Sequence, residues 1–442
     1  MSYDYSGKII SIEKALSLVK DGDYIVTSAS AAEAHEFLMN LHKIVDWGVK
    51  DVSITTCLTA TEGKYLSDPA YAGKIDVDSW FYTPVLRRYQ DTQTISHIPG
   101  HLRYYGKRRL QCKKPNIFIG NASLPDKHGY VSVSLSAVYE REMWENADMI
   151  MLEINPHVPR TFGDVELHID DVDYLIETDY SMPDLTESEP TEQDYKIGKM
   201  VAEEINDGDC IQLGIGGMPN AIAKSLYNKK DLGVHTEMLT SEIPRLFKAG
   251  VITGKKKNVY PRKMVCAFVY GSREMCDFVD NNPGVLVLRG SFVNDPHIIG
   301  LNDNQVSINS SIEIDVTGQC CSETIGTRHF SGTGGQADTA IGALNSKGGR
   351  SYICIYSTAT VKDKDGGTKK ISKIVPTLKQ GAVVSLSRND VDRIVTEYGI
   401  AELRGTNVRE RVEKLTAIAH PDFREDIMRQ SMELGIIRKK SY

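Results

Sequence analysis

The stretch DLGVHTEMLTSE, residues 231–242, places a carboxylate, Glu237, at the end of an apolar, strand-like segment. A carboxylate in that position is either a solvated cap or a reagent. As a reagent, it can attack an activated acyl group and form a covalent anhydride. The reaction needs a carboxylate that is ionised, desolvated on one side and rigidly held, and the end of a buried strand provides such a position.

A glycine-rich loop, LGIGGMPNAI at residues 213–222, precedes this segment. It follows a strand-like run and opens a helix-like one. Glycines allow a sharp turn and bring backbone N–H groups close to a ligand. Free N–H groups at a helix start attract phosphates and developing oxyanions. The same pattern also fits a tight strand-to-helix turn that binds nothing.

A dinucleotide site is the nearest competing interpretation of this loop. Its fingerprint, G-x-G-x-x-G, requires a glycine at position 219, where the chain has Pro219. Glu237 lies at a suitable sequence distance for the ribose-binding acid of such a fold. The missing glycine makes this interpretation the weaker one.

A second glycine cluster, FSGTGGQAD at residues 330–338, is either a surface loop or a second set of backbone donors. Because the chain has two glycine-rich loops and a carboxylate at a strand end, we expect both loops and the carboxylate to form one site. His235 is expected to have a structural or hydrogen-bonding role rather than to act as a general base. The sequence contains no G-x-S-x-G or H-E-x-x-H motif. No C-x-x-C pair or zinc-type spacing occurs either, so no metal site is expected.

Strand-like and helix-like segments alternate along the chain, which predicts an α/β fold with largely parallel or mixed sheets. An acidic stretch with two prolines, residues 177–196, is predicted to be the interdomain linker. The predicted domains are residues 1–185 and 186–442. Short apolar runs predict buried strands, among them VSITTCL, NIFIGNA, MIMLEIN, CIQLGIGG, GVLVLRG, SYICIYS and AVVSLS.

A weak internal repeat supports two domains. Residues 17–41 and 203–226 each contain a helix-like run, an Asp-Gly-Asp turn, a strand-like run, a loop of small residues and a second helix-like run. The similarity continues from KDVSITTCL into KDLGVHTEML. In that pairing, Cys57 occupies the position of Glu237, so only the second copy has the carboxylate.

Composition excludes several classes of protein. The net charge is −7 without a basic block, which argues against a nucleic-acid binder. No run approaches the ~20 apolar residues of a membrane span. The N-terminus lacks the features of a signal peptide. Several of the eight cysteines lie in apolar runs, which is typical of reduced thiols in a cytoplasmic protein.

The residues together resemble a known family. QLGIGGMPNAI, GVHTEM, FSGTGGQAD, SRNDVDRIVTEYGIAELRG and AHPDFR are similar to motifs of the class I CoA-transferases of the acetyl-CoA hydrolase/transferase group. Within it, the likeness is to 4-hydroxybutyrate and butyryl-CoA:acetate CoA-transferases, and it covers essentially the whole chain. The resemblance implies two tandem CoA-transferase-type α/β domains with the active site between them.

The resemblance also implies site residues and chemistry. Glu237 corresponds to the family's catalytic glutamate, which carries CoA as a glutamyl thioester in a ping-pong transfer between a short-chain acyl-CoA and acetate. No metal or redox cofactor is implied, and the expected partners are acyl-CoA, a short-chain carboxylate and further copies of the chain. An acyl-CoA hydrolase on the same fold and, less favoured, a nucleotide-dependent oxidoreductase are the alternatives. The CoA-binding and oxyanion positions map onto Gly214, Ile215, Gly216, Gly217, Met218, Ser331 and Gly335.

Overall fold

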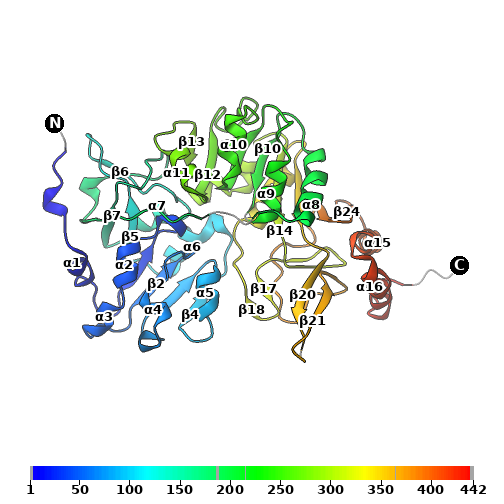
Figure 1. Cartoon of the computed structure of the whole chain (residues 1–442), viewed down its shortest axis with the longest axis horizontal. Coiled ribbons are helices and arrows are strands. Elements are labelled where there is room, and N and C mark those ends of the chain that lie inside the picture. Colours follow the sequence, from blue (N-terminus) through cyan, green and yellow to red (C-terminus); the bar gives the residue numbers. More distant parts are fainter. Residues whose placement is uncertain (1–2, 186–188, 215, 364, 439–442) are drawn as a thin grey trace.

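The computed structural model describes residues 3–185, 189–214, 216–363 and 365–438. The chain folds into two α/β halves that lie side by side, with the N-terminus and the C-terminus at opposite ends (Figure 1). The first half is built on a seven-stranded sheet in which all neighbours are parallel. In order across the sheet, its strands are β4 (Ile95–His97), β3 (Asp76–Ser79), β2 (Ser53–Thr56), β1 (Tyr24–Thr27), β5 (Ile117–Ala122), β7 (Met149–Ile154) and β9 (Tyr174–Glu177).

The second half is built on an eight-stranded sheet that is parallel except for its last pair, β23 and β24. Two largely parallel sheets in tandem confirm the predicted fold class. In order across the sheet, the strands are β13 (Val285–Val287), β12 (Met264–Val269), β11 (Gly233–Leu239), β10 (Cys210–Leu213), β14 (Gln305–Ser310), β19 (Arg350–Cys354), β23 (Arg393–Thr396) and β24 (Gly399–Glu402).

Helices cover the sheets, as the crossovers between parallel strands require. Helix α8 shows how the sequence sets one of them: Thr191 and Asp194 form a capping box at its start, and Ile197 and Val201 lie on its buried face. The helices of the two halves include α1 (Ile12–Leu16), α2 (His35–Asn40), α5 (Pro84–Tyr89), α6 (Tyr105–Cys112), α7 (Glu140–Trp144), α8 (Glu192–Glu204), α9 (Gly217–Lys224), α10 (Glu242–Lys248), α11 (Arg273–Val279), α12 (Gly290–Val293), α13 (Pro296–Gly300), α14 (Gln336–Asn345), α15 (Val408–Ile418) and α16 (Pro421–Glu433).

The strand order confirms the internal repeat. In each half the first strand, β1 or β10, lies centrally, with the next three strands on one side and the later strands on the other. The register agrees as well, because Tyr24 pairs with Ser53 and Cys210 pairs with Gly233. Counting forward from these pairs places Cys57 and Glu237 at equivalent positions. A central strand of this kind is a topological switch point, and ligands of open α/β sheets bind at the carboxyl ends of the strands there.

The two halves share a hydrophobic core. Cys57, Trp80 and Tyr105 of the first half belong to the same buried cluster as Met238 and Phe268 of the second. Backbone hydrogen bonds also cross between the halves. The Ala137 N–H donates to the carbonyl of Ala267 at 2.9 Å, and the Val269 N–H donates to the carbonyl of Leu135 at 2.8 Å. The carboxyl end of β11 is therefore enclosed by both halves.

Two local predictions differ from the structure. The run AVVSLS, residues 382–387, is not a strand: Val383 and Val384 are exposed, and only Leu386 forms an isolated bridge, with Cys320. Val383 and Val384 lie at the surface, whereas Leu386 is buried in a core cluster of the second half. The predicted linker ends early, because its last residues form the start of α8. The domain boundary at 185/186 stays a prediction, and the two large sheets lie on either side of it.

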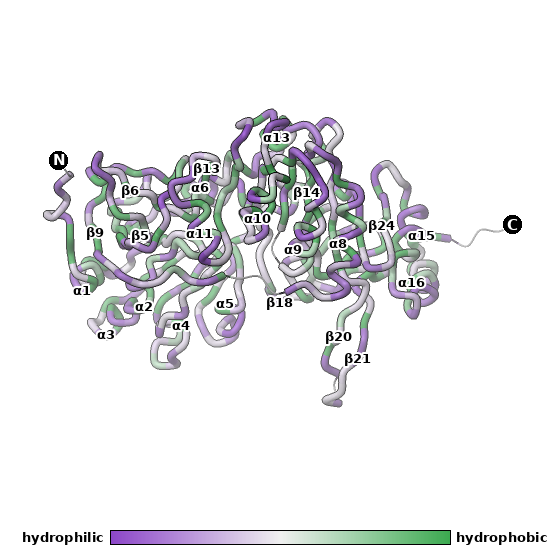
Figure 2. Tube along the Cα trace, turned by 45° about the horizontal axis from the view of Figure 1, so that its top comes forward, coloured by the Kyte–Doolittle hydropathy of each residue, from purple (hydrophilic) through white to green (hydrophobic). Residues whose placement is uncertain are grey.

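The second half also contains short β-hairpins outside its large sheet. The hairpin of β20 (Thr358–Lys362) and β21 (Thr368–Ser372) extends away from the body of the molecule (Figure 2). The hairpin of β17 (Thr324–Ile325) and β18 (Arg328–His329) contacts the first half, since Arg328 pairs with Asp91 at 2.6 Å. The segment that follows β18 carries the second glycine cluster.

Gly163→Ala should strongly destabilise the protein. Gly163 has a φ of +123° and bridges to Val287 of the other half, and an added Cβ would lie 2.3 Å from the Val287 carbonyl oxygen. We expect a loss of about 3 kcal/mol in the free energy of unfolding, from overpacking and backbone strain together. The matched control is Gly22→Ala, where φ is +79° but no atom lies within 4 Å of the added Cβ. That variant should lose only about 1 kcal/mol. Equal losses in denaturant titrations would contradict the inferred contact.

Candidate active site

Glu237 lies near the carboxyl end of β11 and is half-buried, between the buried residues Thr236 and Met238. Two groups donate hydrogen bonds to its carboxylate. The side-chain amide of Asn294 donates from Nδ2 to Oε2 at 2.7 Å, and the backbone N–H of Gly335 donates to the same carboxylate. The strand-end carboxylate predicted from the sequence is thus enclosed and held in place, as a nucleophile requires.

Asn294 was not predicted from the sequence. It is fully buried and follows α12, where its N–H donates to the carbonyl of Gly290 at 3.0 Å. His235 holds Val293, the residue before Asn294, because the His235 Nε2 lies 2.9 Å from the carbonyl oxygen of Val293. Burial, together with Lys257, lowers the pKa of His235 to about 3, so the ring is neutral and donates this hydrogen bond. The structure therefore gives His235 the hydrogen-bonding role expected of it.

Gly335 is the N-cap of α14, so its N–H belongs to the positive end of a helix. A Cβ at this position would lie 1.8 Å from Glu237 Oε2 and 2.0 Å from Asn294 Nδ2. Only glycine therefore allows the backbone to approach the carboxylate so closely. Of the positions in the second loop implied by the resemblance, Gly335 is the one that contacts Glu237.

The second glycine loop lies between the two halves. A Cβ at Gly332 would lie 2.0 Å from the carbonyl oxygen of Trp80, so the loop backbone rests directly on the first half. The Tyr82 N–H donates to the carbonyl of Ser331 at 3.4 Å. The Ser331 hydroxyl points back into the second half, where it donates to the carbonyl of Ser322 at 2.8 Å.

The first glycine loop lies at the same sheet edge as Glu237, because β10 and β11 are parallel neighbours. Gly214 donates its N–H to the carbonyl of Ile308 at 2.9 Å, and Gly216, with a φ of +119°, is the N-cap of α9. Gly217 is the first residue of that helix, and the Met218 side chain is buried in the core.

Ile215 lies outside the described residues. Among the residues that are described, the hydrogen bonds to Glu237 come from Asn294 and Gly335 rather than from the first loop. CoA and oxyanion binding by the first loop therefore stays a prediction.

Burial raises the pKa of Glu237 to about 7, and the hydrogen bonds from Asn294 and Gly335 oppose that rise. Relative to the ordinary value of 4.5, ionising this carboxyl inside the protein costs about 3 kcal/mol. A second carboxyl, that of Asp338 on α14, is fully buried; burial raises its pKa, and the neighbouring Arg103 opposes that rise. Arg103 belongs to the first half and forms an ion pair with Asp338 across the interface.

Cys57, the counterpart of Glu237 in the first half, is also buried. Burial is the main cause that raises the pKa of its thiol well above 9, followed by the carboxyl groups of Glu140 and Glu237. The thiol therefore stays protonated. Of these two equivalent strand-end groups, Glu237 is the one that ionises near neutral pH.

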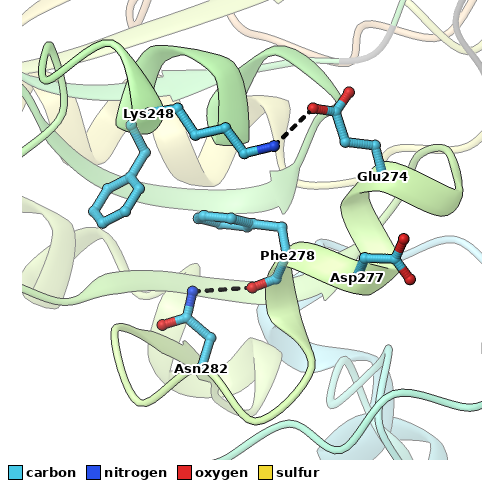
Figure 3. Close-up of a pocket in the computed structure, with 6 residues that line it drawn as sticks. Lys248, Glu274, Asp277, Phe278 and Asn282 are labelled. Atoms are coloured by element: carbon cyan, nitrogen blue, oxygen red, sulfur yellow. Dashed lines mark hydrogen bonds and ion pairs between the residues drawn. The ribbon is translucent and has the colours of Figure 1, made fainter.

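A separate hollow lies on the outer surface between α10 and α11 (Figure 3). In it, Lys248 pairs with Glu274 at 3.0 Å, and the Asn282 side chain donates to the carbonyl of Phe278 at 3.0 Å (Figure 3). Its lining does not include Glu237 or either glycine loop. The reactive groups of the sequence therefore gather at the interface and not in this hollow.

In the described part of the chain, no group of three or more His, Cys, Asp and Glu side chains is arranged to hold a metal ion. In the same ranges, none of the helices combines the length and the apolar character needed to cross a membrane.

Comparison with known proteins identifies the class that this fold and site define. The N-terminal domain model of acetyl-CoA hydrolase/transferase matches residues 1–184, and the C-terminal domain model matches residues 271–431. The chain therefore belongs to the acetyl-CoA hydrolase/transferase family, as the resemblance predicted. Relatives over nearly the whole chain are CoA-transferases, and the protein is accordingly an enzyme of the CoA-transferase type.

Three similar proteins illustrate the relationship. A succinyl-CoA:cyclohexane-1-carboxylate CoA transferase of Geobacter metallireducens is 37% identical, over 98% of this chain and 97% of the relative. A 4-hydroxybutyrate coenzyme A transferase of Clostridium kluyveri is 36% identical, over 96% and 97%. The crystal structure of RipA from Yersinia pestis superposes with a TM-score of 0.89 at 29% identity, over 98% of this chain and 99% of that one.

Gly335→Ala should nearly abolish CoA transfer, because the methyl group would displace the Glu237 carboxylate or the Asn294 amide. We expect kcat to fall about 100-fold or more, the usual effect of losing one such backbone donor. Gly367→Ala is the matched control, since no atom lies within 4 Å of its added Cβ. Steady-state assays of the two purified variants test this, and near-normal turnover of Gly335→Ala would show that the contact is unimportant.

The acidic limb of the pH–rate profile should report Glu237. Because attack requires the carboxylate, kcat/KM should rise with pH through a midpoint of about 7. Asn294→Ala removes a hydrogen bond that lowers this pKa, so its midpoint should move to higher pH while kcat falls. Rate profiles between pH 5 and 9 measure both values (about two units on either side of the midpoint). A wild-type kcat/KM that does not rise with pH within this range would contradict the assignment.

Proposed function

We propose that this protein transfers CoA between a short-chain acyl-CoA and acetate through a covalent glutamyl-CoA thioester on Glu237. The observation that carries the proposal is the setting of this one side chain. Glu237 is half-buried at a strand end between two domains, and Asn294 and Gly335 both hydrogen-bond to its carboxylate. A solvated cap would have neither the burial nor the paired donors.

The donors suggest how the chemistry is divided between the two carboxylate oxygens. Asn294 binds Oε2, which leaves Oε1 to attack the thioester carbonyl of the acyl-CoA. The C–S bond then breaks, giving an acyl-glutamyl anhydride and a CoA thiolate. The thiolate next attacks the glutamyl carbonyl carbon, the first carboxylate leaves, and a glutamyl-CoA thioester remains. An incoming carboxylate reverses these steps and departs as the new acyl-CoA.

Negative charge develops on Oε2 each time the glutamyl carbon becomes tetrahedral. Asn294 Nδ2 and the Gly335 N–H are already directed at the carboxylate, so they need little reorganisation to stabilise that charge. We assign the oxyanion role at the glutamyl carbon to these two groups. The loop at residues 214–218 is proposed to bind CoA, whose phosphates suit the backbone donors of a glycine-rich helix start.

Hydrolysis of acyl-CoA is the second candidate function, because the family includes hydrolases by its description. Hydrolysis requires a water positioned and deprotonated next to the anhydride or thioester. The nearest histidine in the sequence, His235, has its pKa lowered to about 3 and donates a hydrogen bond to the Val293 carbonyl, so it is too weak a base to deprotonate water, which favours transfer over hydrolysis. Dependence of CoA release on added acetate distinguishes the two.

The acid exchanged with acetate is proposed to be short and monocarboxylic, such as butyrate or 4-hydroxybutyrate. Two relatives of nearly equal identity are named for different acids, cyclohexane-1-carboxylate and 4-hydroxybutyrate, so similarity alone does not choose between them. The reaction as written needs no metal or redox cofactor. We place the enzyme in the cytoplasm as a homo-oligomer; its cysteines are unpaired, in keeping with a reducing compartment.

Glu237→Gln tests the proposal directly. The amide is nearly isosteric with the carboxylate but a far weaker nucleophile, so we expect transfer to fall by at least about 1,000-fold. Wild-type enzyme incubated with acyl-CoA and borohydride should show, by peptide mass spectrometry, reduction of the thioester at Glu237 to an alcohol. Glu274→Gln, a change at a surface glutamate that pairs with Lys248, should retain both activity and labelling. Labelling elsewhere, or an active Glu237→Gln variant, would remove the proposed function.

A further inference from the structure

The Gly334–Gly335 peptide is held by the opposite half of the molecule. The Leu102 N–H donates to the carbonyl of Gly334 at 3.0 Å, and the Gly334 N–H donates to the hydroxyl of Tyr105 at 3.2 Å. Leu102 and Tyr105 belong to the first half, whereas Glu237 belongs to the second. Both backbone polar groups of Gly334 are thus satisfied across the interface.

This arrangement acts directly on the donor to Glu237. The carbonyl of Gly334 and the N–H of Gly335 are parts of one planar peptide group, so fixing the carbonyl also fixes the direction of the N–H. A continuous chain of hydrogen bonds runs from Leu102 through this peptide to Glu237. Such chains strengthen each member by polarisation.

The hydrogen bonds from the first half are needed because the glycine turn is flexible by itself. Two consecutive glycines have a wide range of accessible backbone conformations, and Gly334 adopts a φ of +53°. Without external contacts the Gly335 N–H would sample many directions. Held at both ends, it is aimed before the substrate arrives, which is the condition for electrostatic stabilisation of a transition state.

Tyr105 is itself rigid. Its side chain is only 2% exposed, and its ring stacks on Trp80 with centroids 5.0 Å apart and planes at 11°. Burial raises the pKa of the phenol well above 10, so the hydroxyl stays neutral and its oxygen accepts from Gly334. The backbone of Trp80 also packs against Gly332 of the same loop.

A further contact fixes the helix behind the turn. The side chain and the backbone N–H of Arg103 both bind the carboxylate of Asp338, in the first turn of α14. Residues 102–105 thus contact the turn at Gly334 and the helix that follows it. Each contact comes from the same short segment of the first half.

We infer that residues 102–105 of the N-terminal half orient the oxyanion donor at Glu237, with Tyr105 as the positioning residue whose side chain holds Gly334. This inference rests on the proposed function of Glu237. Tyr105 acts through the peptide and makes no bond to the transferred group.

Tyr105→Phe tests the inference, since it keeps the ring against Trp80 and removes only the acceptor oxygen. We expect kcat to fall about 10- to 100-fold, with KM for acyl-CoA unchanged within about twofold. The acidic limb of kcat/KM should move to higher pH, because a less well-aimed Gly335 N–H lowers the pKa of Glu237 less. A purely structural role would lower stability without moving this limb.

Tyr71→Phe is the matched control. It makes the same chemical change elsewhere in the first half, where the Tyr71 hydroxyl donates to Asp46 at 3.1 Å. Its kcat and pH profile should equal those of the wild type. As a second measurement, hydrogen–deuterium exchange of peptides covering Gly334 and Gly335 should speed up in Tyr105→Phe and not in Tyr71→Phe.

If Tyr105→Phe does not fold, 3-fluorotyrosine at position 105 keeps the hydroxyl but weakens its oxygen as an acceptor, and kcat should still decrease severalfold. Wild-type kcat, pH profile and exchange rates in Tyr105→Phe would overturn the positioning role. Provided that Glu237→Gln is inactive in the same assays, that result would leave the glutamyl mechanism standing. An active Glu237→Gln enzyme would instead refute the mechanism on which this inference rests.

Discussion

The structure depends on a carboxylate that must ionise where ionisation is unfavourable. Burial of Glu237 raises its pKa to about 7, which makes the carboxylate a stronger base and nucleophile than one in water. Hydrogen bonds from Asn294 and Gly335 limit this rise, so that an appreciable fraction stays ionised near neutral pH. Strand β11 carries the acid, and its two donors lie at the end of α12 and at the start of α14.

The two halves of the repeat contribute unequally. The second half supplies Glu237 and both of its donors, whereas the first half has the protonated thiol of Cys57 at the equivalent strand end. The first half holds the glycine turn through Tyr105, and its Trp80 belongs to the same buried cluster as Met238, the residue after Glu237. A duplicated fold thus has one reactive copy and one supporting copy.

Much of this arrangement is predictable from the sequence, and the limits have physical causes. Alternating apolar runs and the Asp-Gly-Asp repeat predict the paired parallel sheets, because buried strands need continuous apolar residues. Glu237 and Gly335 stand out through their motifs. Asn294 does not, because an asparagine that ends a short helix resembles any surface asparagine until the chain is folded. The strand predicted at AVVSLS was wrong, because a short apolar run alone does not distinguish a central strand from an irregular segment that is partly exposed.

The cluster that joins Cys57, Trp80 and Tyr105 to Met238 and Phe268 has a consequence for how this chain is inherited. Each half also has a buried cluster of its own, but separating the halves would expose the shared cluster to water, so neither is a self-sufficient module that recombination might pass to another protein. Gene fission would succeed only if both fragments were made together and found each other. The two repeated halves are therefore tied to each other by the core that they share.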